Sequence, residues 1–283
     1  MVETKKLIGN YVLCPENVLG KGSFGVVYLG SSKSDPKTNL AIKQININVS
    51  ETELQELGIV IGNEITVVQS LSNSHIVKLI DTVMTRNNLY IITEFCNGGD
   101  LGARKNDISI EETLSCIRQI SKGMVYANSQ KIIHRDLKPS NILIHDGVIK
   151  IADFGMSRFV DSHKTQSKLI FKRGSPIYMA PEVFKGKDYC SKCDVWSVGI
   201  IFYELLFKKT PWDGSNANDL FYNIKKQILK FPKNENVDPL IMDLIEKMLQ
   251  IDQNLRYDFG EVLKHEALNK KTMEKIAKAK DLK

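Results

Sequence analysis

The pattern of apolar and polar positions changes character part-way along the chain. From about Tyr11 to Ile92, β-branched and aromatic runs such as VVYLG, LAIKQI, VKLIDTV and LYIITEF are broken by Gly, Asn, Asp and Pro. SSKSDPKTN and TRNN separate these runs and have the composition of hairpin turns. The first part of the chain is therefore predicted to consist mainly of strands.

One predicted helix interrupts these strands. Within Glu53–Ser72, the apolar residues Ile61, Ile65, Val68 and Leu71 recur at the spacing of one helix face. The β-rich part is thus expected to be a set of strands around a single helix.

Beyond Cys96–Asp100, with the sequence CNGGD, the apolar residues take the helical period. Ser109 and Glu112 form a capping box that predicts a helix start. CDVWSVGIIFYELLF is apolar nearly all round, which is typical of a buried central helix. DLFYNIKKQIL and DPLIMDLIEKMLQ are amphipathic, and Pro239 stands near the start of the second. We expect an α+β protein in which a small β-rich lobe and a larger, mainly α-helical lobe enclose a ligand cleft.

Composition excludes two classes of protein. With 283 residues, 42% hydrophobic and 25% charged, the chain can bury a sizeable core, so disorder of the bulk is excluded. The most apolar stretch, Val195–Phe207, is too short for a membrane span and contains Glu204. The opening MVETKKLIGN lacks the apolar core of a signal peptide.

Cysteine usage and charge add two further expectations. The odd set of five cysteines predicts reduced thiols, hence a cytosolic or nuclear protein: Cys14, Cys96, Cys116, Cys190 and Cys193. The last two form a lone CxxC, which lacks the second ligand pair of a zinc site. The net charge is +6, and seven lysines against three acids between positions 264 and 283 carry most of it. A basic C-terminal segment of this kind favours a solvated helix over a nucleic-acid-binding face.

GKGSFGVV carries the first candidate chemistry. Gly20, Gly22 and Gly25 allow backbone amides to approach an anion without obstruction by Cβ atoms. A dinucleotide-binding fold would place such glycines before a helix. Here GVVYLG continues as a strand, so the glycines are predicted to form a hairpin over an anionic ligand.

LAIK places Lys43 on the next strand. A lysine that points inward from an apolar strand needs an anion, and Glu64 on the predicted helix is its natural partner. The alternative is a surface lysine whose stem covers apolar surface.

The densest cluster of polar side chains lies in IIHRDLKPSNILI and in the IADFG that follows. Asp136, Asn141 and Asp153 provide one acceptor for a proton and two oxygen ligands for hard cations. Lys138 adds a positive charge beside Asp136. Such groups between apolar runs are expensive to bury without a function.

In their order and spacing, these motifs resemble those of eukaryotic-type protein kinases, and the resemblance covers about Tyr11 to Leu268. APE at Ala180–Glu182, DVWSVG at Asp194–Gly199 and the late Arg256 extend it. The resemblance implies a bilobal fold with an N-lobe at about 11–94, a hinge at about 94–98, a C-lobe at about 99–268 and a basic tail at 269–283.

The resemblance also implies an ATP site and its residues. The glycine-rich loop would cover the phosphates with Gly20, Lys21, Gly22, Ser23, Phe24 and Gly25. Val27 and Ala41 would touch the adenine, and Thr93 would be a small gatekeeper residue. The segment from Glu94 to Cys96 would present backbone groups to the edge of the adenine. Lys43 would hold the α- and β-phosphates and pair with Glu64.

The same resemblance assigns the catalytic roles. Asp136 would accept the proton of the substrate hydroxyl, and Lys138 would steady the γ-phosphate. Asn141 and Asp153 would hold Mg²⁺.

Two structural roles follow from it as well. Glu182 and Arg256 would form an ion pair in the large lobe, and Asp194 would brace the catalytic loop through backbone amides.

Substrate class follows from the motifs in the same way. HRDLKPSN, together with Ser175 in GSPIYMAPE, resembles serine/threonine kinases, so Ser and Thr hydroxyls of proteins are the expected acceptors. Ser140 stands where many arginine-directed kinases have Glu, although Asp100 and Glu204 remain as acids in this lobe. EFCNGGDL and GSPIYMAPEV are similar to the autophagy-initiating kinase group, with calcium/calmodulin-type kinases as another near neighbour.

Control by phosphorylation is a further implication of the family. Arg135 would receive an activation-loop phosphate. Phe171 occupies a position where Thr is frequent, which leaves Thr165 and Ser167 as candidate sites for an upstream kinase or for autophosphorylation. Docking of the loop by Phe171 without phosphate is the alternative.

Three other functions are weighed against protein phosphorylation. A pseudokinase scaffold would typically have lost Lys43, Asp136 or Asp153, and all three are present. A small-molecule kinase usually lacks APE and the segment after it. A nucleic-acid-binding role rests only on the lysines of the tail. The sequence does not specify a physiological substrate or an oligomeric state.

Overall fold

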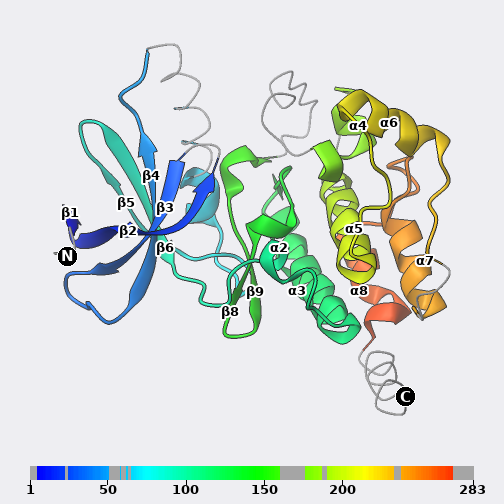
Figure 1. The fold of residues 1–283 in the computed structure, drawn as a ribbon, viewed down its shortest axis with the longest axis horizontal. Coiled ribbons are helices and arrows are strands. Elements are labelled where there is room, and N and C mark those ends of the chain that lie inside the picture. Colours follow the sequence, from blue (N-terminus) through cyan, green and yellow to red (C-terminus); the bar gives the residue numbers. More distant parts are fainter. Residues whose placement is uncertain are drawn as a thin grey trace.

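The computed structural model describes residues 5–22, 25–50, 58, 62, 65–159, 176–186, 190–232 and 237–269. Strands gather at one end of the molecule and helices at the other, with a small hairpin between them (Figure 1). This arrangement follows the change of hydrophobic period along the sequence.

The strands of the first part form one antiparallel sheet in the order β1-β2-β3-β4-β6-β5. Their bounds are β1 Lys6–Ile8, β2 Tyr11–Gly22, β3 Gly25–Ser32, β4 Asn39–Asn46, β5 Leu79–Met84 and β6 Asn88–Glu94. The hydroxyl of Tyr11 in β2 donates to Asp81 Oδ2 in β5 at 3.0 Å. Because these strands are not neighbours in the sheet, the contact shows that the sheet curls strongly.

Strand register decides which side chains share a face. Lys43 lies opposite Val27 on β3 and opposite Ile91 on β6, and Ala41 lies opposite Thr93. Successive side chains of a strand point to opposite faces, so Val27, Ala41, Lys43 and Thr93 share one face. The other face is a closed apolar cluster that includes Leu40, Ile42, Tyr90 and Ile92.

The second part of the chain is mainly helical. Its helices are α2 Leu101–Arg104, α3 Ile110–Ser129, α4 Pro181–Phe184, α5 Lys192–Phe207, α6 Ala217–Lys226, α7 Pro239–Met248 and α8 Phe259–Lys264. Short strands complete it: β7 Ile132–Ile133, β8 Ile142–His145, β9 Val148–Ile151 and β10 Arg158–Phe159. β8 pairs with β9, and β10 pairs with β7.

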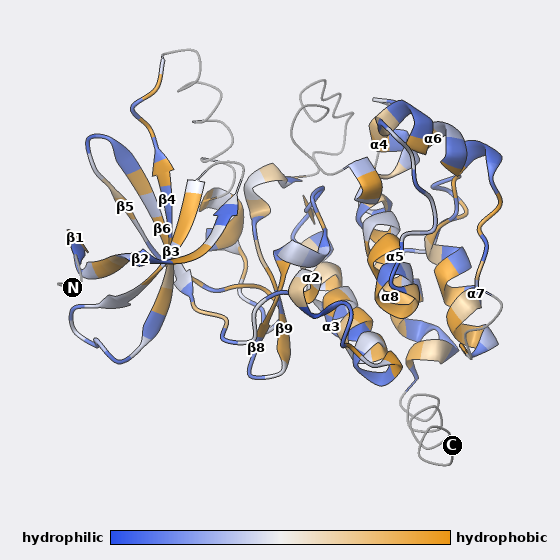
Figure 2. Cartoon of the chain, viewed as in Figure 1, coloured by the Kyte–Doolittle hydropathy of each residue, from blue (hydrophilic) through white to orange (hydrophobic). Residues whose placement is uncertain are grey.

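Helix α5 is the centre of the larger core. Every residue from Cys193 to Phe207 is buried, including Asp194 and Glu204. Hydrophobic residues occupy most of α5, whereas hydrophobic and hydrophilic residues alternate along α3 and α7 (Figure 2). The amphipathic helices therefore pack their apolar faces toward α5.

Most of the expected elements are confirmed. α3 begins with the capping box of Ser109 and Glu112, and α7 has Pro239 at its first turn. Within Glu53–Ser72, the described residues Gly58, Gly62 and 65–70 are helical, whereas Leu71 and Ser72 are described but not helical, and the remaining residues of that range lie outside the described part. The lobe and tail boundaries stay predictions, and residues 270–283 lie outside the described part.

Two absences hold for the described ranges. None of their helices combines the length and apolar character needed to cross a membrane. All five cysteines, each of which is described, are free thiols.

Candidate active site

Two distant segments meet at Lys43 and Asp153. Lys43 Nζ on β4 lies 3.1 Å from Asp153 Oδ1, and the two side chains are 14% and 32% exposed. The ammonium group therefore faces an anion in a partly desolvated place, and the alternative of a surface lysine is wrong. The pair joins the sheet of the first part to the segment that follows β9. The predicted partner, Glu64, lies outside the described residues.

Asp153 is held in an unusual backbone conformation, with φ +62° and ψ +66°. Burial raises the pKa of its carboxyl group, but the charge and hydrogen bond of Lys43 outweigh burial and hold that pKa below its usual value. The carboxylate therefore stays ionised at neutral pH. Left-handed backbone at a non-glycine residue is strained, and such strain concentrates at functional sites.

Asp136, Lys138 and Asn141 lie together on the loop after β7. Lys138 Nζ lies 2.7 Å from Asp136 Oδ2. Asn141 Nδ2 donates to the Asp136 carbonyl oxygen at 2.8 Å and to Oδ2 at 3.2 Å. A short 3₁₀ helix, Pro139–Asn141, brings the amide back toward Asp136. The loop thus gathers a carboxylate, an ammonium group and an amide.

Asp194 of α5 binds the backbone of this loop. Its carboxylate accepts hydrogen bonds from the backbone N–H groups of His134 and Arg135, each at 2.8 Å. Asp194 is 0% exposed, so burial raises its pKa above the usual value, while the two N–H donors act in the opposite direction. Arg135 has φ +69°, which these bonds and a 2.6 Å bond from its Nε to the Met156 carbonyl oxygen help to maintain. The predicted bracing role of Asp194 matches this geometry.

The side chains that could hold Mg²⁺ are oxygen donors. Both hydrogen bonds that Asn141 donates to Asp136 use Nδ2, so they leave its amide oxygen unused. Asp153 adds an ionised carboxylate. Within the described ranges, no group of three or more His, Cys, Asp or Glu side chains is placed to hold a metal ion. A site with few protein oxygens fits Mg²⁺, which usually keeps water and phosphate oxygens among its ligands.

The described glycines of the GKGSFG loop are not equivalent. A Cβ atom at Gly25 would overlap the carbonyl oxygen of Gln44 on the neighbouring strand. At Gly20 such an atom would meet nothing within 4 Å, and at Gly22 only the Gly25 carbonyl oxygen, 3.8 Å away. Gly25 is therefore required by sheet packing, whereas Gly20 and Gly22 leave open space beside the backbone. Lys21, between them, is exposed.

The predicted hinge residues follow directly on the sheet. Thr93 is half-buried beside Ala41, and Glu94 ends β6. Cys96 is 9% exposed, and burial raises the pKa of its thiol to about 11, so the group stays neutral. The region between the sheet and α2 is therefore short and partly buried.

Several expected residues lie outside the described part of the chain. They are Ser23, Phe24, Glu64, Thr165, Ser167, Phe171 and Ser175.

The structural ion pair that the resemblance implied is present. Arg256 Nη1 and Nη2 contact Glu182 Oε1 and Oε2 at 2.6 and 3.0 Å. Both residues are buried. The pair ties the APE segment to the loop after α7.

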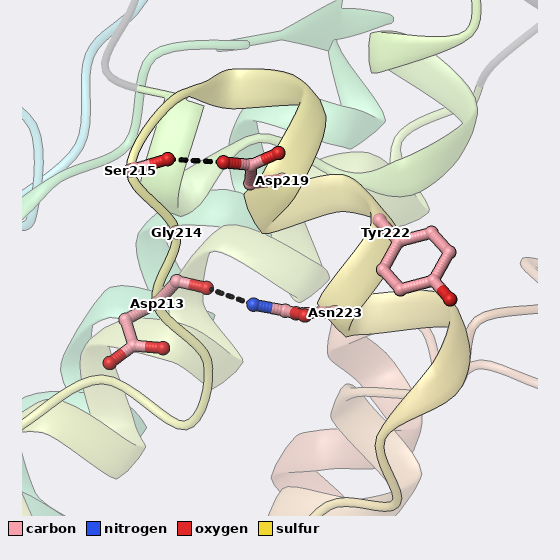
Figure 3. Close-up of a pocket in the computed structure, with 6 residues that line it drawn as sticks. All are labelled: Asp213, Gly214, Ser215, Asp219, Tyr222 and Asn223. Carbon is pink, nitrogen blue, oxygen red and sulfur yellow. Dashed lines mark hydrogen bonds between the residues drawn. The ribbon is translucent and has the colours of Figure 1, made fainter.

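A surface pocket of about 490 Å³ lies at the start of α6, away from all these residues. Its polar groups bond to one another: Ser215 donates to Asp219, and Asn223 Nδ2 donates to the Asp213 carbonyl oxygen at 2.8 Å (Figure 3). None of the predicted catalytic residues lines it.

Two further ion pairs among the described residues were not predicted. Lys150 Nζ lies 2.8 Å from Glu94 Oε1, and Lys105 Nζ lies 2.9 Å from Glu204 Oε1. None of the motifs in the sequence analysis pairs these residues, which lie 56 and 99 positions apart.

Comparison with known proteins identifies a family whose domain spans all the site residues described above. The sequence pattern of the protein kinase domain matches residues 14–268. The chain belongs to the protein kinase family. The expected α+β kinase fold is thereby confirmed, with its curled sheet followed by helices.

Three relatives place this kinase domain among serine/threonine kinases. Serine/threonine-protein kinase atg1 from Dictyostelium discoideum is 33% identical over 276 residues, which cover 93% of this chain and 40% of the relative. Serine/threonine-protein kinase ULK1 from Homo sapiens is 34% identical over 277 residues, which cover 93% and 26%. Serine/threonine-protein kinase 33 from Bos taurus is 31% identical over 272 residues, which cover 90% and 55%. The chain thus spans less than half of the first two relatives.

Proposed function

We propose that this kinase domain transfers the γ-phosphoryl group of ATP to Ser and Thr hydroxyls of proteins. The single observation that carries the proposal is the meeting of Lys43 with Asp153, beside a loop that holds Asp136, Lys138 and Asn141 together. The match to the protein kinase domain and the serine/threonine kinase relatives support the same activity.

In the proposed site, Lys43 binds the α- and β-phosphates of ATP. Gly20, Gly22 and the backbone around them cover the phosphates, and the open space at these glycines supports this role. Val27, Ala41 and Thr93 share the face of the sheet that receives the adenine, with the backbone of Glu94 and Cys96 at its edge.

The chemical step then asks mainly for position and positive charge. Asp136 accepts the proton of the substrate hydroxyl, and Lys138, 2.7 Å from it, is placed to steady the γ-phosphate. Asn141 and Asp153 would hold Mg²⁺, which neutralises charge on the phosphate oxygens.

The contacts of Asp100 and Glu204 bear on whether the site prefers substrates with basic residues around the acceptor hydroxyl. Asp100 caps α2 by accepting from the Ala103 N–H at 3.0 Å. Glu204 Oε1 forms an ion pair with Lys105 Nζ at 2.9 Å, and Glu204 Oε2 accepts a hydrogen bond from the Tyr178 hydroxyl at 2.7 Å. Because both acids are committed to internal contacts, we propose substrates without a strong requirement for basic residues.

The biological setting is proposed from similarity and composition. The relatives named atg1 and ULK1 support a regulatory kinase of the autophagy-initiating group. Five free thiols support the reducing environment of the cytoplasm or nucleus. Activation through Thr165 or Ser167, by an upstream kinase or by autophosphorylation, is a further proposal. It predicts that at least one of Thr165→Ala and Ser167→Ala loses activity, and full activity in both would contradict it.

The test of the proposed function is a peptide-array screen with the purified chain and Mg-ATP. The array contains Ser, Thr and Tyr acceptors in matched sequences with neutral, basic and acidic flanks. The proposal expects transfer to Ser and Thr peptides, none to Tyr, and little gain from basic flanks. Nucleotide binding without transfer to any peptide, in a chain phosphorylated or not, would instead indicate a pseudokinase.

A further inference from the structure

Glu94, the last residue of β6, makes hydrogen bonds through both its side chain and its backbone. Its Oε1 accepts from the Lys78 backbone N–H at 2.8 Å and from Lys150 Nζ at 2.8 Å. Its own N–H donates to the Lys78 carbonyl oxygen at 3.0 Å. The side chains of Lys150 and Glu94 are 13% and 20% exposed, so the ion pair is partly desolvated. Glu94 is therefore fixed by both its backbone and its carboxylate.

Lys150 belongs to the same short segment as Asp153. It lies on β9, three residues before Asp153, and β9 is anchored by bonds from Val77 N to the Ile151 carbonyl oxygen at 2.9 Å and from Ile151 N to the His75 carbonyl oxygen at 2.8 Å. Segment 150–153 thus makes one ion pair at each end with the sheet. Lys150 contacts Glu94 on β6, and Asp153 contacts Lys43 on the neighbouring strand β4.

Nucleotide binding would affect these two ion pairs differently. Lys43 and Asp153 have roles toward phosphate and metal, so their direct contact competes with the ligand. The side chains of Lys150 and Glu94 would not contact the nucleotide, because the adenine would bind the backbone of the hinge and not the Glu94 carboxylate. Their contact is free to persist when the nucleotide is bound.

We propose that Lys150 is a positioning residue for the nucleotide site, which fixes the hinge backbone through Glu94 at a set distance from Asp153. The inference rests on the proposed function, because it takes the hinge as the adenine-binding edge. Loss of the ion pair then loosens the hinge and weakens nucleotide binding. The chemical step is affected less, because Asp136, Lys138 and Asn141 are held by Asp194 and by one another.

The surroundings of the Lys150–Glu94 pair should tolerate substitution of Lys150. Lys150, Glu94 and Lys78 line a pocket of about 650 Å³ between β5, the loop before it and β9. A shorter or neutral side chain at position 150 leaves space that water can enter, rather than a sealed cavity in the core. Lys78 supplies a matched control, because its contacts with Glu94 use backbone atoms and its side chain is exposed.

The experiment compares Lys150→Met, Lys150→Arg and Lys78→Met with the unmodified chain. Affinity for Mg²⁺ with a non-hydrolysable ATP analogue is measured by calorimetry, and KM for ATP and kcat are measured on a Ser peptide. We expect Lys150→Met to weaken analogue binding and raise KM about tenfold, with kcat within about twofold. Lys150→Arg should recover most of the affinity, and Lys78→Met should bind like the unmodified chain. Glu94→Gln combined with Lys150→Met should be no weaker than Lys150→Met alone.

The outcomes separate positioning from other roles. Analogue affinity in Lys150→Met within twofold of the unmodified chain overturns the inference. A rise in kcat also overturns it, because the pair would then restrain the enzyme. An equal weakening in Lys78→Met indicates general loss of charge and overturns it as well. If the unmodified chain binds the analogue but transfers no phosphate, the proposed function fails while the binding measurements still decide this inference.

Discussion

Arg256 meets Glu182 through two parallel hydrogen bonds, at 2.6 and 3.0 Å, in a place where both side chains are almost fully buried. Arg256 also donates from Nε to the Gln250 carbonyl oxygen at 2.9 Å, and its guanidinium group lies 5.1 Å from the centre of the Trp196 ring. A buried charge with so many partners is costly to leave alone. The pair therefore fixes the APE segment against the helical core.

Replacement of one partner should destabilise the fold strongly. Arg256→Met leaves the Glu182 carboxylate buried without its counter-charge, so we expect a loss of about 3–5 kcal/mol in the free energy of unfolding. Urea titration followed by circular dichroism measures this. Lys247→Met, at an exposed ion pair with Asp243, is the control and should cost less than about 1 kcal/mol. Equal losses of unfolding free energy in the two variants would show that the buried ion pair stabilises the fold no more than the exposed one does.

Asp194 offers a test of how the catalytic loop is held. Asp194→Asn keeps the shape of the side chain but replaces one acceptor oxygen with an N–H₂ group, which cannot accept from His134 N or Arg135 N. We expect kcat to fall at least about tenfold, while affinity for the nucleotide changes little. Steady-state kinetics on a Ser peptide check this. Unchanged kcat in a folded Asp194→Asn variant would contradict the bracing role.

The two kinds of glycine in the GKGSFG loop should respond differently to alanine. Gly25→Ala forces a Cβ atom into the Gln44 carbonyl oxygen, so it should lower the melting temperature. Gly20→Ala meets open space and should leave the melting temperature nearly unchanged, yet weaken ATP binding if the loop covers the phosphates. Differential scanning fluorimetry with and without Mg-ATP distinguishes them. The same change in melting temperature for both variants would contradict this assignment.

Lys43 and Asp153 predict a dependence on pH. The pKa of Asp153 is held below its unfolded value, so its contribution to stability is present above about pH 4 and is lost as the pH falls through the lowered pKa. Lys43→Met removes the main cause of that lowering. The variant should lose roughly 1–3 kcal/mol of unfolding free energy at pH 7, and this difference should shrink below about pH 4.

Carboxyl-carbon NMR titration of Asp153 reports the same effect directly. The pKa of Asp153 should rise in Lys43→Met and should stay low in Lys122→Met, a change at an exposed residue of α3. An Asp153 pKa that does not move in Lys43→Met would show that the ion pair is not the cause of the lowering.

The longer elements could be predicted because their patterns repeat. α3 and α7 contain enough apolar positions for the helical period to be read, β4 and β6 stand out as β-branched and aromatic runs, and α5 stands out as a segment that is apolar nearly all round. The short elements could not, because they depend on partners elsewhere in the chain. β10 is two residues long and exists through pairing of Arg158 with Ile133, and α2 has only four residues after its Asp100 cap.

The candidate site shows the same division. Its residue types stand together in short motifs, so the acids, the lysines and Asn141 could be selected from the sequence alone. Which of them touch could not be selected, because Lys43 and Asp153 are 110 positions apart. No motif pairs Lys150 with Glu94 or Lys105 with Glu204, so these contacts depend on how the strands and helices pack.

The most direct test of the central claim is transfer of radiolabelled γ-phosphate from Mg-ATP to a Ser peptide by the unmodified chain and by Asp136→Asn. We predict that the variant binds ATP with nearly unchanged affinity and that its kcat falls by about 10²–10⁴-fold, because it lacks the carboxylate that we propose accepts the hydroxyl proton. A kcat in Asp136→Asn equal to that of the unmodified chain would contradict the account.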